Sequence, residues 1–496
     1  MNRMTENKGV LFNIFISIAY LFFLGYVIFR ACSVSFTIDE AISFSMLKNG
    51  SGFYDSANNH YLNTGLMWIF NALFGMSELS LRMPNVLAFL LYSVYGFKIL
   101  SKLGNQWMFL IGFVLLIVNP YLIEFFSLAR GYGLSLAFMM AAVYYLLREI
   151  PDEKGIRRFL KTLIAGLACC ILAVYANFGM LNFIITAQFI FLLQFIRVCR
   201  KNKYLKQSHI IYAIAIVVVS VALLIPALMQ LLRLKELSQL YFGGDNNFVD
   251  NSMLSLVSFS AYENPLLKFL FKIIAIFLVA TLPAGMLMML VKKGCASGFR
   301  TTLLLVILMV AAPVIEFYLF GSPYPKNRTA LVYLPLFGIF ITYFIAELYK
   351  IFNKKAGITV LSAISGIVLL ALSSNFIYCM NTRFAVEWNF DQDTKAVMKT
   401  IAGRHNQGLY GNRQLSIAND WRNAASINYY RERYSMDFLN AATRDSINRD
   451  ADIYFGPSAL IRTITIPGVR VVDFFDNTNS FLAEKILPPN PANIRQ

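Results

Sequence analysis

Apolar runs of about 20 residues recur along the first 380 positions and constrain the fold more than any other feature. Each run is long enough to cross the ~30 Å hydrocarbon core of a bilayer as an α-helix. Hydrophobic residues make up 57% of the 496 positions, and the mean hydropathy is +0.58. The pattern therefore predicts an α-helical polytopic membrane protein of about eleven spans, near residues 9–30, 80–101, 106–123, 128–147, 159–177, 178–197, 208–232, 266–291, 300–320, 329–349 and 356–379.

The net charge of +17 would suggest a nucleic-acid partner in a soluble protein, but here the basic residues cluster in short loops between spans. Loops rich in Lys and Arg favour the cytoplasmic side. With a cytoplasmic N-terminus, the inside loops hold Lys98, Lys102, Arg148, Lys154, Arg157, Arg158, Lys161, Arg197, Arg200, Lys201, Lys203, Lys206, Lys292, Lys293, Arg300, Lys350, Lys354 and Lys355. The outside loops hold only Lys48, Arg233, Lys235, Lys326 and Arg328. Residues 31–79, which form the first outside loop, and the C-terminus are therefore expected on the outer side of the membrane. Because the basic residues are explained by this orientation, nucleic acid is not expected as a partner.

The six cysteines lie within or beside the expected spans and form no C-x-x-C pair, so neither a zinc site nor a disulfide framework is indicated. The first apolar run is too long for the core of a signal peptide and has no small-residue cleavage site. We therefore expect it to be a retained helix.

Two outside loops are long enough to have structure of their own. In residues 31–79, the stretch "LNTGLMWIFNALFG" at 62–75 has helical periodicity and suits a helix at the membrane interface. The loop 233–265 contains Gly243, Gly244, Asp245 and several Asn residues, and we interpret it as a mobile segment able to cover a cavity.

The composition changes after residue 380. Residues 380–496 contain 14 basic and 12 acidic residues and no further apolar run of spanning length. Short β-like runs, "QLSIAN", "ADIYFG" and "VRVVDFF", alternate with the helical stretches "DQDTKAVMKTIAGRH" and "WRNAASINYYRERY". The sequence thus predicts a membrane module at 1–379 and a soluble C-terminal α/β domain at 380–496.

The adjacent acids Asp39 and Glu40 follow the first expected span. Carboxylates at a membrane surface are costly to keep dry, so they are solvated, ligate a partner or handle a proton. We expect the last two roles, and a solvated helix cap is the alternative.

Four stretches carry a resemblance to a known family: "TIDEAISF", "NNHYLNTGLMWIFNALFGMSELSLRMPNVLAF", "NPYLIEFFSLARGYGLSL" and "YPKNRTALVYLPLF". They resemble GT-C-fold glycosyltransferases of the branch that contains protein O-mannosyltransferases and lipid A aminoarabinose transferases. The matches are the D-E pair, the H-P-P-L run at His60, E-x-x-x-R-x-P at Glu78, Arg82 and Pro84, and A-R-x-Y at Arg130 and Tyr132. Tyr61 and Leu62 replace the family's two prolines after His60.

This resemblance implies a transferase in a bacterial inner membrane, with its active site and C-terminal domain facing the periplasm or exterior. A polyprenyl-phosphate sugar would be the donor, a glycan, lipid or protein the acceptor, and attack at the anomeric carbon would invert it. Asp39 is the expected general base, with Glu40 beside it. Cations stabilise a departing phosphate, and Arg130, Arg82, Lys326 and Arg328 are the expected donor-phosphate ligands. His60 and Tyr132 are expected to contact the acceptor or to shape a loop.

The resemblance also leaves a divalent metal ion open, because some relatives have metal-assisted sites. The ion would bridge Asp39 and Glu124, although two or three oxygens are few ligands for such an ion.

Several of the other site residues have a structural alternative. Glu124 at the end of a span could face water, Arg130 could anchor its helix to lipid phosphates, and Arg82 could stabilise a turn before Pro84. Lys326 and Arg328 could be plain membrane-surface charges.

Three other classes of protein remain open. A transporter or flippase would have internal repeats and ionisable residues near the bilayer midplane, whereas the acids here lie mainly at the outer ends of spans. A polysaccharide polymerase or ligase is closer in chemistry, but the early D-E loop and the C-terminal domain fit it less well. A non-catalytic scaffold fits least.

Overall fold

The computed structural model describes residues 2–50, 55–148, 155–201, 206–292, 294–352, 355–444, 450–457 and 468–486. Basic loop residues used to predict the orientation, Lys154, Lys203, Lys293 and Lys354, lie outside these ranges. The chain forms two compact units. The first consists of residues 1–28, 54–66 and 82–380, and the second of residues 29–53, 67–81 and 381–496.

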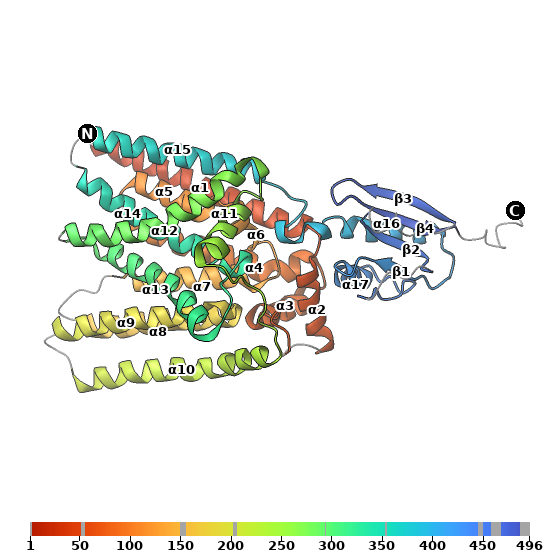
Figure 1. The fold of residues 1–496 in the computed structure, drawn as a ribbon, viewed down its shortest axis with the longest axis horizontal. Coiled ribbons are helices and arrows are strands. Elements are labelled where there is room, and N and C mark those ends of the chain that lie inside the picture. Colours follow the sequence, from red (N-terminus) through yellow and green to blue (C-terminus); the bar gives the residue numbers. More distant parts are fainter. Residues whose placement is uncertain are drawn as a thin grey trace, which may run out of the picture. The chain divides into compact units, whose positions relative to one another are not determined.

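The first unit is helical (Figure 1). Its long helices are α1 (Asn2–Ser33, of which the last turn belongs to the second unit), α4 (Glu78–Ser101), α8 (Gly155–Ala176), α9 (Leu181–Lys201), α10 (Gln207–Glu236), α12 (Lys268–Val291), α13 (Ser297–Phe320), α14 (Tyr333–Ile351) and α15 (Lys355–Cys379). Among the described residues, these nine are long and apolar enough to cross a membrane. The expected helical membrane fold is confirmed.

The expected count of eleven spans is not confirmed. The remaining two correspond to the shorter apolar helices α5 (Gln106–Ile117) and α7 (Gly131–Leu146). The run expected at 106–123 breaks because Asn119 precedes a proline, which disfavours helical backbone. The Asn119 side chain accepts from Leu122 N–H at 2.9 Å and starts the five-residue helix α6 (Pro120–Glu124) instead.

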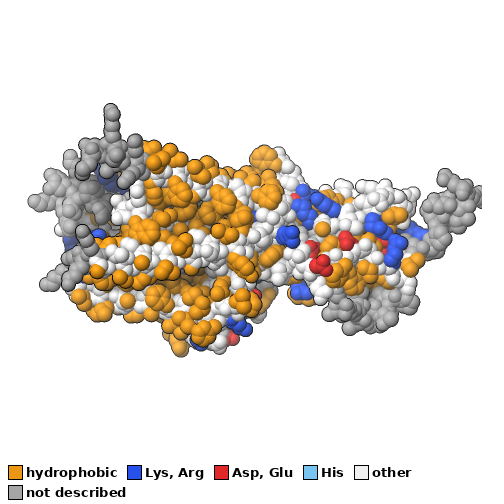
Figure 2. All heavy atoms as spheres, turned by 90° about the horizontal axis from the view of Figure 1, so that it is seen from above, with side chains coloured by type: hydrophobic (Ala, Val, Ile, Leu, Met, Phe, Trp, Pro, Cys, Tyr) orange, Lys and Arg blue, Asp and Glu red, His pale blue; other side chains and the backbone are white. Residues whose placement is uncertain are grey.

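The helical surface of the first unit is largely apolar. Figure 2 shows hydrophobic side chains covering the helical part, while Lys, Arg, Asp and Glu gather over the strand-containing part. Large apolar side chains on the spans are widely exposed, for example Phe277 at 66%, Leu287 at 61% and Ile367 at 67%. Lipid contact accounts for so much exposed apolar surface. Inside the unit, α8 packs against α7, α9 and α10, and α14 packs against α5 and α13.

The second half of the outside loop expected at 233–265 has regular structure. It contains the π-helix η2 (Val249–Met253), α11 (Leu254–Ser260) and the 3-10 helix η3 (Pro265–Leu267). Gly244 forms a two-way backbone bridge with Tyr324, which precedes the 3-10 helix η4 (Asn327–Ala330). A further short 3-10 helix, η1 (Phe178–Met180), joins α8 to α9.

The second unit combines two loop helices with a small α/β part. The helices are α2 (Ile38–Asn49), the C-terminal part of α3 (Tyr61–Phe74), the 3-10 helix η5 (Val386–Asp391), α16 (Thr394–Asn406) and α17 (Ala424–Arg433). The strands are β1 (Ile417–Asn419), β2 (Ile453–Pro457), β3 (Val469–Phe475) and β4 (Ser480–Lys485). Their order is β1-β2-β4-β3, in which only β1 and β2 pair in parallel.

The predicted secondary structure of the C-terminal region is confirmed. Each of the three β-like runs coincides with a strand, and each of the two helical stretches with a helix, to within a few residues at the ends. The helix expected at 62–75 is α3, one residue earlier at both ends. The strand β4 was not predicted. It pairs with both β2 and β3, and Tyr454 and Ala483 are fully buried in the core around it.

Candidate active site

Asp39 and Glu40 lie in the first turn of α2. Thr37 is the N-cap of this helix and forms a capping box with Glu40. The Thr37 N–H donates to Glu40 Oε2 at 2.9 Å, and the Glu40 N–H donates to Thr37 Oγ1 at 3.4 Å. The Glu40 side chain is fully buried, whereas Asp39 is half-buried. Glu40 therefore caps the helix but is buried, not solvated as the alternative expected, and Asp39 is the acid of the pair that lies outside the capping box.

The family-like acid Glu78 lies at the start of α4 and is 2% exposed. Its carboxylate accepts from Tyr430 Oη at 3.1 Å, lies 3.0 Å from Lys395 Nζ and forms an ion pair with Arg433. All three partners come from the C-terminal region, so Glu78 joins residues 67–81 to α16 and α17 within the second unit. A buried carboxylate requires such partners.

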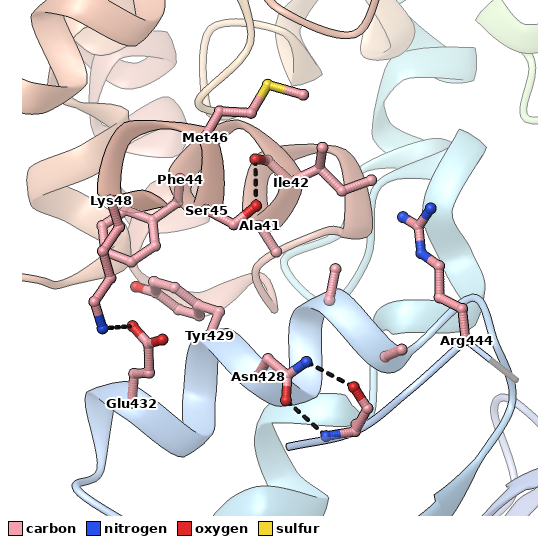
Figure 3. Close-up of a pocket in the computed structure, with 13 residues that line it drawn as sticks. Ala41, Ile42, Phe44, Ser45, Met46, Lys48, Asn428, Tyr429, Glu432 and Arg444 are labelled. Atoms are coloured by element: carbon pink, nitrogen blue, oxygen red, sulfur yellow. Dashed lines mark hydrogen bonds and ion pairs between the residues drawn. The ribbon is translucent and has the colours of Figure 1, made fainter. Parts of the chain in front are cut away.

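Figure 3 shows a groove in the second unit between α2 and α17, with a volume of about 310 Å³. Ala41, Phe44 and Tyr429 form apolar parts of its lining, and Ser45 and Asn428 add polar groups. Lys48 Nζ and Glu432 Oε2 form an ion pair of 3.0 Å at one end, and Arg444 lies at the other. The groove thus has one wall on the helix that carries Asp39.

Arg130 is 1% exposed and lies at the start of α7, in the first unit. Its Nη1 donates to Asn58 O at 3.0 Å, and its Nη2 donates to Asn58 Oδ1 at 2.7 Å. The guanidinium is thus held inside the protein and does not reach outward to a lipid surface. The alternative that Arg130 is an interface anchor does not fit this burial.

An amide network fixes the backbone around Arg130. Asn85 Nδ2 donates to Asn63 Oδ1 at 2.7 Å, and Asn63 Nδ2 donates to Ala129 O at 3.0 Å. Asn85 Oδ1 also accepts from Leu134 N–H at 3.1 Å. A Cβ on Gly131 would lie 1.8 Å from the Ala176 carbonyl oxygen, so only glycine allows this approach. The stretch that resembles A-R-x-Y is therefore closely packed.

His60 packs against this segment, with its ring 4.9 Å from that of Tyr132 in an edge-to-face arrangement. Its Nδ1 lies 3.0 Å from Ala176 O, so Nδ1 carries the hydrogen and Nε2 is an acceptor in the neutral ring. Burial holds the pKa of His60 well below its usual 6.5, and the positive charges of Arg130 and then Arg328 lower this pKa further. His60 is therefore neutral and lies in a positive field.

Tyr132 and Arg328 line one narrow cavity of about 10 Å³, together with Ser135, Asn177 and Thr329. Arg328 lies over the Phe242 ring at 4.5 Å, which favours a cation–π contact. Lys326 is exposed. The structure therefore groups Arg130, Arg328, His60 and Tyr132 in the first unit and places Lys326 at its surface.

Arg82 is fully buried in α4. The alternative that it stabilises a turn before Pro84 is wrong, because Pro84 lies inside this helix.

Glu124 is 2% exposed, so the alternative that its carboxylate faces water is wrong. Its Oε1 accepts from Tyr262 Oη.

Asp39 and Glu124 belong to different units. Among the residues that the structure describes, no three His, Cys, Asp or Glu side chains gather as a metal site. A divalent ion therefore stays a prediction, and no chemical step below depends on it.

Sequence reasoning missed the partners that hold these groups. Asn58 binds Arg130, and Asp391 and Tyr430 bind the backbone at the start of α2. Asp391 and Tyr430 are separated from their partners by 353 and 394 positions, so no local pattern could reveal them. The capping box could have been predicted from the sequence, since Thr37 and Glu40 have the T-x-x-E spacing of this motif.

Comparison with known proteins gives a structural likeness only. No family model matches the chain, and no curated protein matches it in sequence. ArnT from Cupriavidus metallidurans in the apo state matches with a TM-score of 0.50 and 11% identity, covering 97% of this chain and 98% of that chain. The same protein bound to undecaprenyl phosphate gives a TM-score of 0.50 at 12% identity, covering 94% and 97%.

A third solved structure, the oligosaccharyltransferase of Archaeoglobus fulgidus, gives a TM-score of only 0.33, which does not establish a common fold. ArnT is a GT-C lipid A aminoarabinose transferase. Its match extends over nearly the whole of both chains, so the expected likeness in fold to the GT-C glycosyltransferases is confirmed: this chain has the fold of ArnT.

Proposed function

We propose that this chain is an integral-membrane glycosyltransferase that moves a sugar from a polyprenyl-phosphate donor to an acceptor on the outer face of the membrane. The observation that carries the proposal is the ArnT fold over 97% of the chain, combined with the family-like D-E pair at the start of α2. ArnT has a solved structure with undecaprenyl phosphate bound, which supports a lipid phosphate as the donor's carrier.

In the proposed reaction, an acceptor hydroxyl oxygen attacks the anomeric carbon of the donor sugar. The bond from that carbon to the phosphate oxygen breaks, and the polyprenyl phosphate leaves with the electron pair. The configuration at the carbon inverts, and the hydroxyl proton passes to the Asp39 carboxylate. Glu40 is the less suitable base because its carboxylate is buried in the capping box.

We propose Arg130 and Arg328 as the groups that bind the donor phosphate. The Tyr132 ring lies 4.9 Å from the His60 ring, and Tyr132 lines one cavity with Arg328. The lowering of the His60 pKa by both guanidinium charges supports this grouping. Guanidinium groups stabilise the charge that develops on a leaving phosphate. Lys326 is a weaker candidate because it is exposed. Neutral His60 would offer Nε2 as a hydrogen-bond acceptor to a hydroxyl group of a substrate.

We infer that the acceptor lies along the groove between α2 and α17, because α2 also carries Asp39. Ala425 lines this groove and is half-buried, so Ala425→Trp would fill space without entering the core. This variant is expected to raise the KM for the acceptor and to leave donor affinity unchanged. An unchanged acceptor KM would remove the groove from the proposal.

The test of the general base is Asp39→Asn, assayed by release of labelled sugar from a polyprenyl-phosphate donor in proteoliposomes. General-base assistance contributes about 10² to 10⁴ in rate, and the variant should lose at least that order. Asp55→Asn is the matched control, since Asp55 is an acid of the same expected loop that pairs with exposed Arg233 at 2.6 Å. Turnover that persists in Asp39→Asn would rule out the base assignment.

The test of the phosphate site is donor binding by Arg130 variants. Arg130→Ala should weaken binding strongly, and Arg130→Lys should restore it only partly because a lysine lacks the forked donors. Lys235→Ala, which removes an exposed cation of α10, is the control. Normal donor affinity in Arg130→Ala would leave the guanidinium with a structural role only.

A further inference from the structure

The four residues between α1 and α2, Val34 to Thr37, have no regular secondary structure, so their backbone groups need other partners. Val34 and Thr37 donate their N–H groups locally, to Arg30 O and Glu40 Oε2. Residues more than 350 positions later bind the rest of this segment and the first residue of α2. The Phe36 N–H donates to Tyr430 Oη at 2.7 Å, and the Ile38 N–H donates to Asp391 Oδ2 at 2.7 Å. Ser35 Oγ donates to Gln392 O at 2.7 Å. The start of α2 is thus held by the C-terminal region, within one compact unit.

Asp391 occupies the point where three helices begin. It accepts from Ile38 at the start of α2, from Thr394 Oγ1 at 3.4 Å at the start of α16, and from Asn423 Nδ2 at 3.2 Å just before α17. Its side chain is 1% exposed. Helix N-termini attract negative charge, so one carboxylate can order all three helix starts.

The charge balance at Asp391 supports a functional interpretation. Burial raises the pKa of this carboxyl to about 7, against the lowering effect of its hydrogen bonds, and Asp39 raises it further. Arg422, beside α17, also interacts electrostatically with Asp391. An apolar side chain in this place would avoid the cost of a buried acid but would leave the Ile38 N–H without this acceptor.

Tyr430 makes the second contact. Its hydroxyl accepts from the Phe36 N–H and donates to Glu78 Oε1 at 3.1 Å, so both functions of the hydroxyl are used. The Phe36 ring stacks on Tyr429 with centroids 4.0 Å apart, which fixes the same segment from another side.

We propose that Asp391 and Tyr430 are positioning residues that set the location of the Asp39 carboxylate through the backbone of residues 36–38. Asp39 directly follows Ile38, so movement of the Ile38 amide moves Asp39 as well. The functional part of this inference rests on the proposed transferase activity. A displacement of about 1 Å at a reacting group can cost about 10² in rate.

Two measurements on the full-length protein in detergent test this proposal. The first is hydrogen exchange of the peptide that covers residues 33–44, which needs no activity. Asp391→Ala and Tyr430→Phe should each lower its protection at least about tenfold, since each removes one acceptor of a backbone N–H. Asp393→Ala is the matched control, because Asp393 accepts from Thr478 Oγ1 at 2.8 Å, in the segment between β3 and β4.

The second measurement separates kcat from KM in the transfer reaction. Both variants should lower kcat by about tenfold to a hundredfold and leave the KM for the donor within about twofold, because only the base is displaced. Asp391→Asn, which keeps one carbonyl acceptor for Ile38, should recover part of kcat.

The outcomes separate the two proposals. Unchanged exchange of residues 33–44 in Asp391→Ala and Tyr430→Phe would overturn the positioning role. So would an equal loss of protection in Asp393→Ala. Altered exchange with no transfer activity in the unmodified protein would instead contradict the proposed function. If Asp391→Ala does not fold, Tyr430→Phe still decides the question, since it removes only one hydroxyl.

Discussion

Two substitutions of Glu40 can distinguish a structural role of its carboxylate from a catalytic role. They are Glu40→Gln and Glu40→Ala, whose effects are to be compared. Glutamine keeps a carbonyl oxygen that can accept from the Thr37 N–H, and it serves in capping boxes as glutamate does. Alanine removes this acceptor and leaves a buried N–H with its hydrogen bond broken.

The magnitude follows from the contact. A buried donor left without its acceptor costs about 1 to 3 kcal/mol, and loss of an N-cap interaction costs about 1 kcal/mol. Each 1.4 kcal/mol is a factor of about ten in an equilibrium constant. Glu40→Ala should therefore open the first turn of α2 about tenfold or more often, while Glu40→Gln should stay close to the unmodified protein.

The assay combines hydrogen exchange of residues 33–44 with the initial rate of sugar transfer at saturating donor. We expect normal exchange and a rate within a few-fold of normal for Glu40→Gln, and faster exchange with a reduced rate for Glu40→Ala. If Glu40→Gln lost transfer as completely as Asp39→Asn while exchange stayed normal, Glu40 would be the chemical group and our assignment would be wrong.

Three further predictions concern the fold and the setting of the site. Arg404 donates to both oxygens of Glu484 at 2.7 and 2.6 Å, so Arg404→Ala should destabilise the protein by about 3 to 5 kcal/mol in denaturant unfolding. Arg470→Ala, which removes an exposed partner 3.9 Å from the same carboxylate, should cost less than about 1 kcal/mol. A reporter fused after Gln496 should be extracytoplasmic and one inserted after Lys203 cytoplasmic, and the reverse at either site would overturn the orientation. A chelator should lower transfer only if a divalent ion takes part.

Local patterns determined much of the fold. Apolar runs predicted all nine long helices among the described residues, because the length and composition needed to cross a bilayer are local properties. The alternation of β-like and helical stretches predicted β1, β2, β3, α16 and α17. The two spans predicted at 106–123 and 128–147 correspond to the shorter helices α5 and α7. Asn119 before a proline ends one early, and the extended backbone of Arg130 delays the start of the other.

The sequence also indicated which acids and cations to examine, but not how they are held. Residues 37–40 contain the capping signal that separates Glu40 from Asp39. The support of this pair by Asp391 and Tyr430 depends on hydrogen bonds between residues 353 and 394 positions apart, which no local pattern encodes. Only the tertiary structure brings such partners together, because a buried backbone N–H can take any acceptor that the fold places beside it.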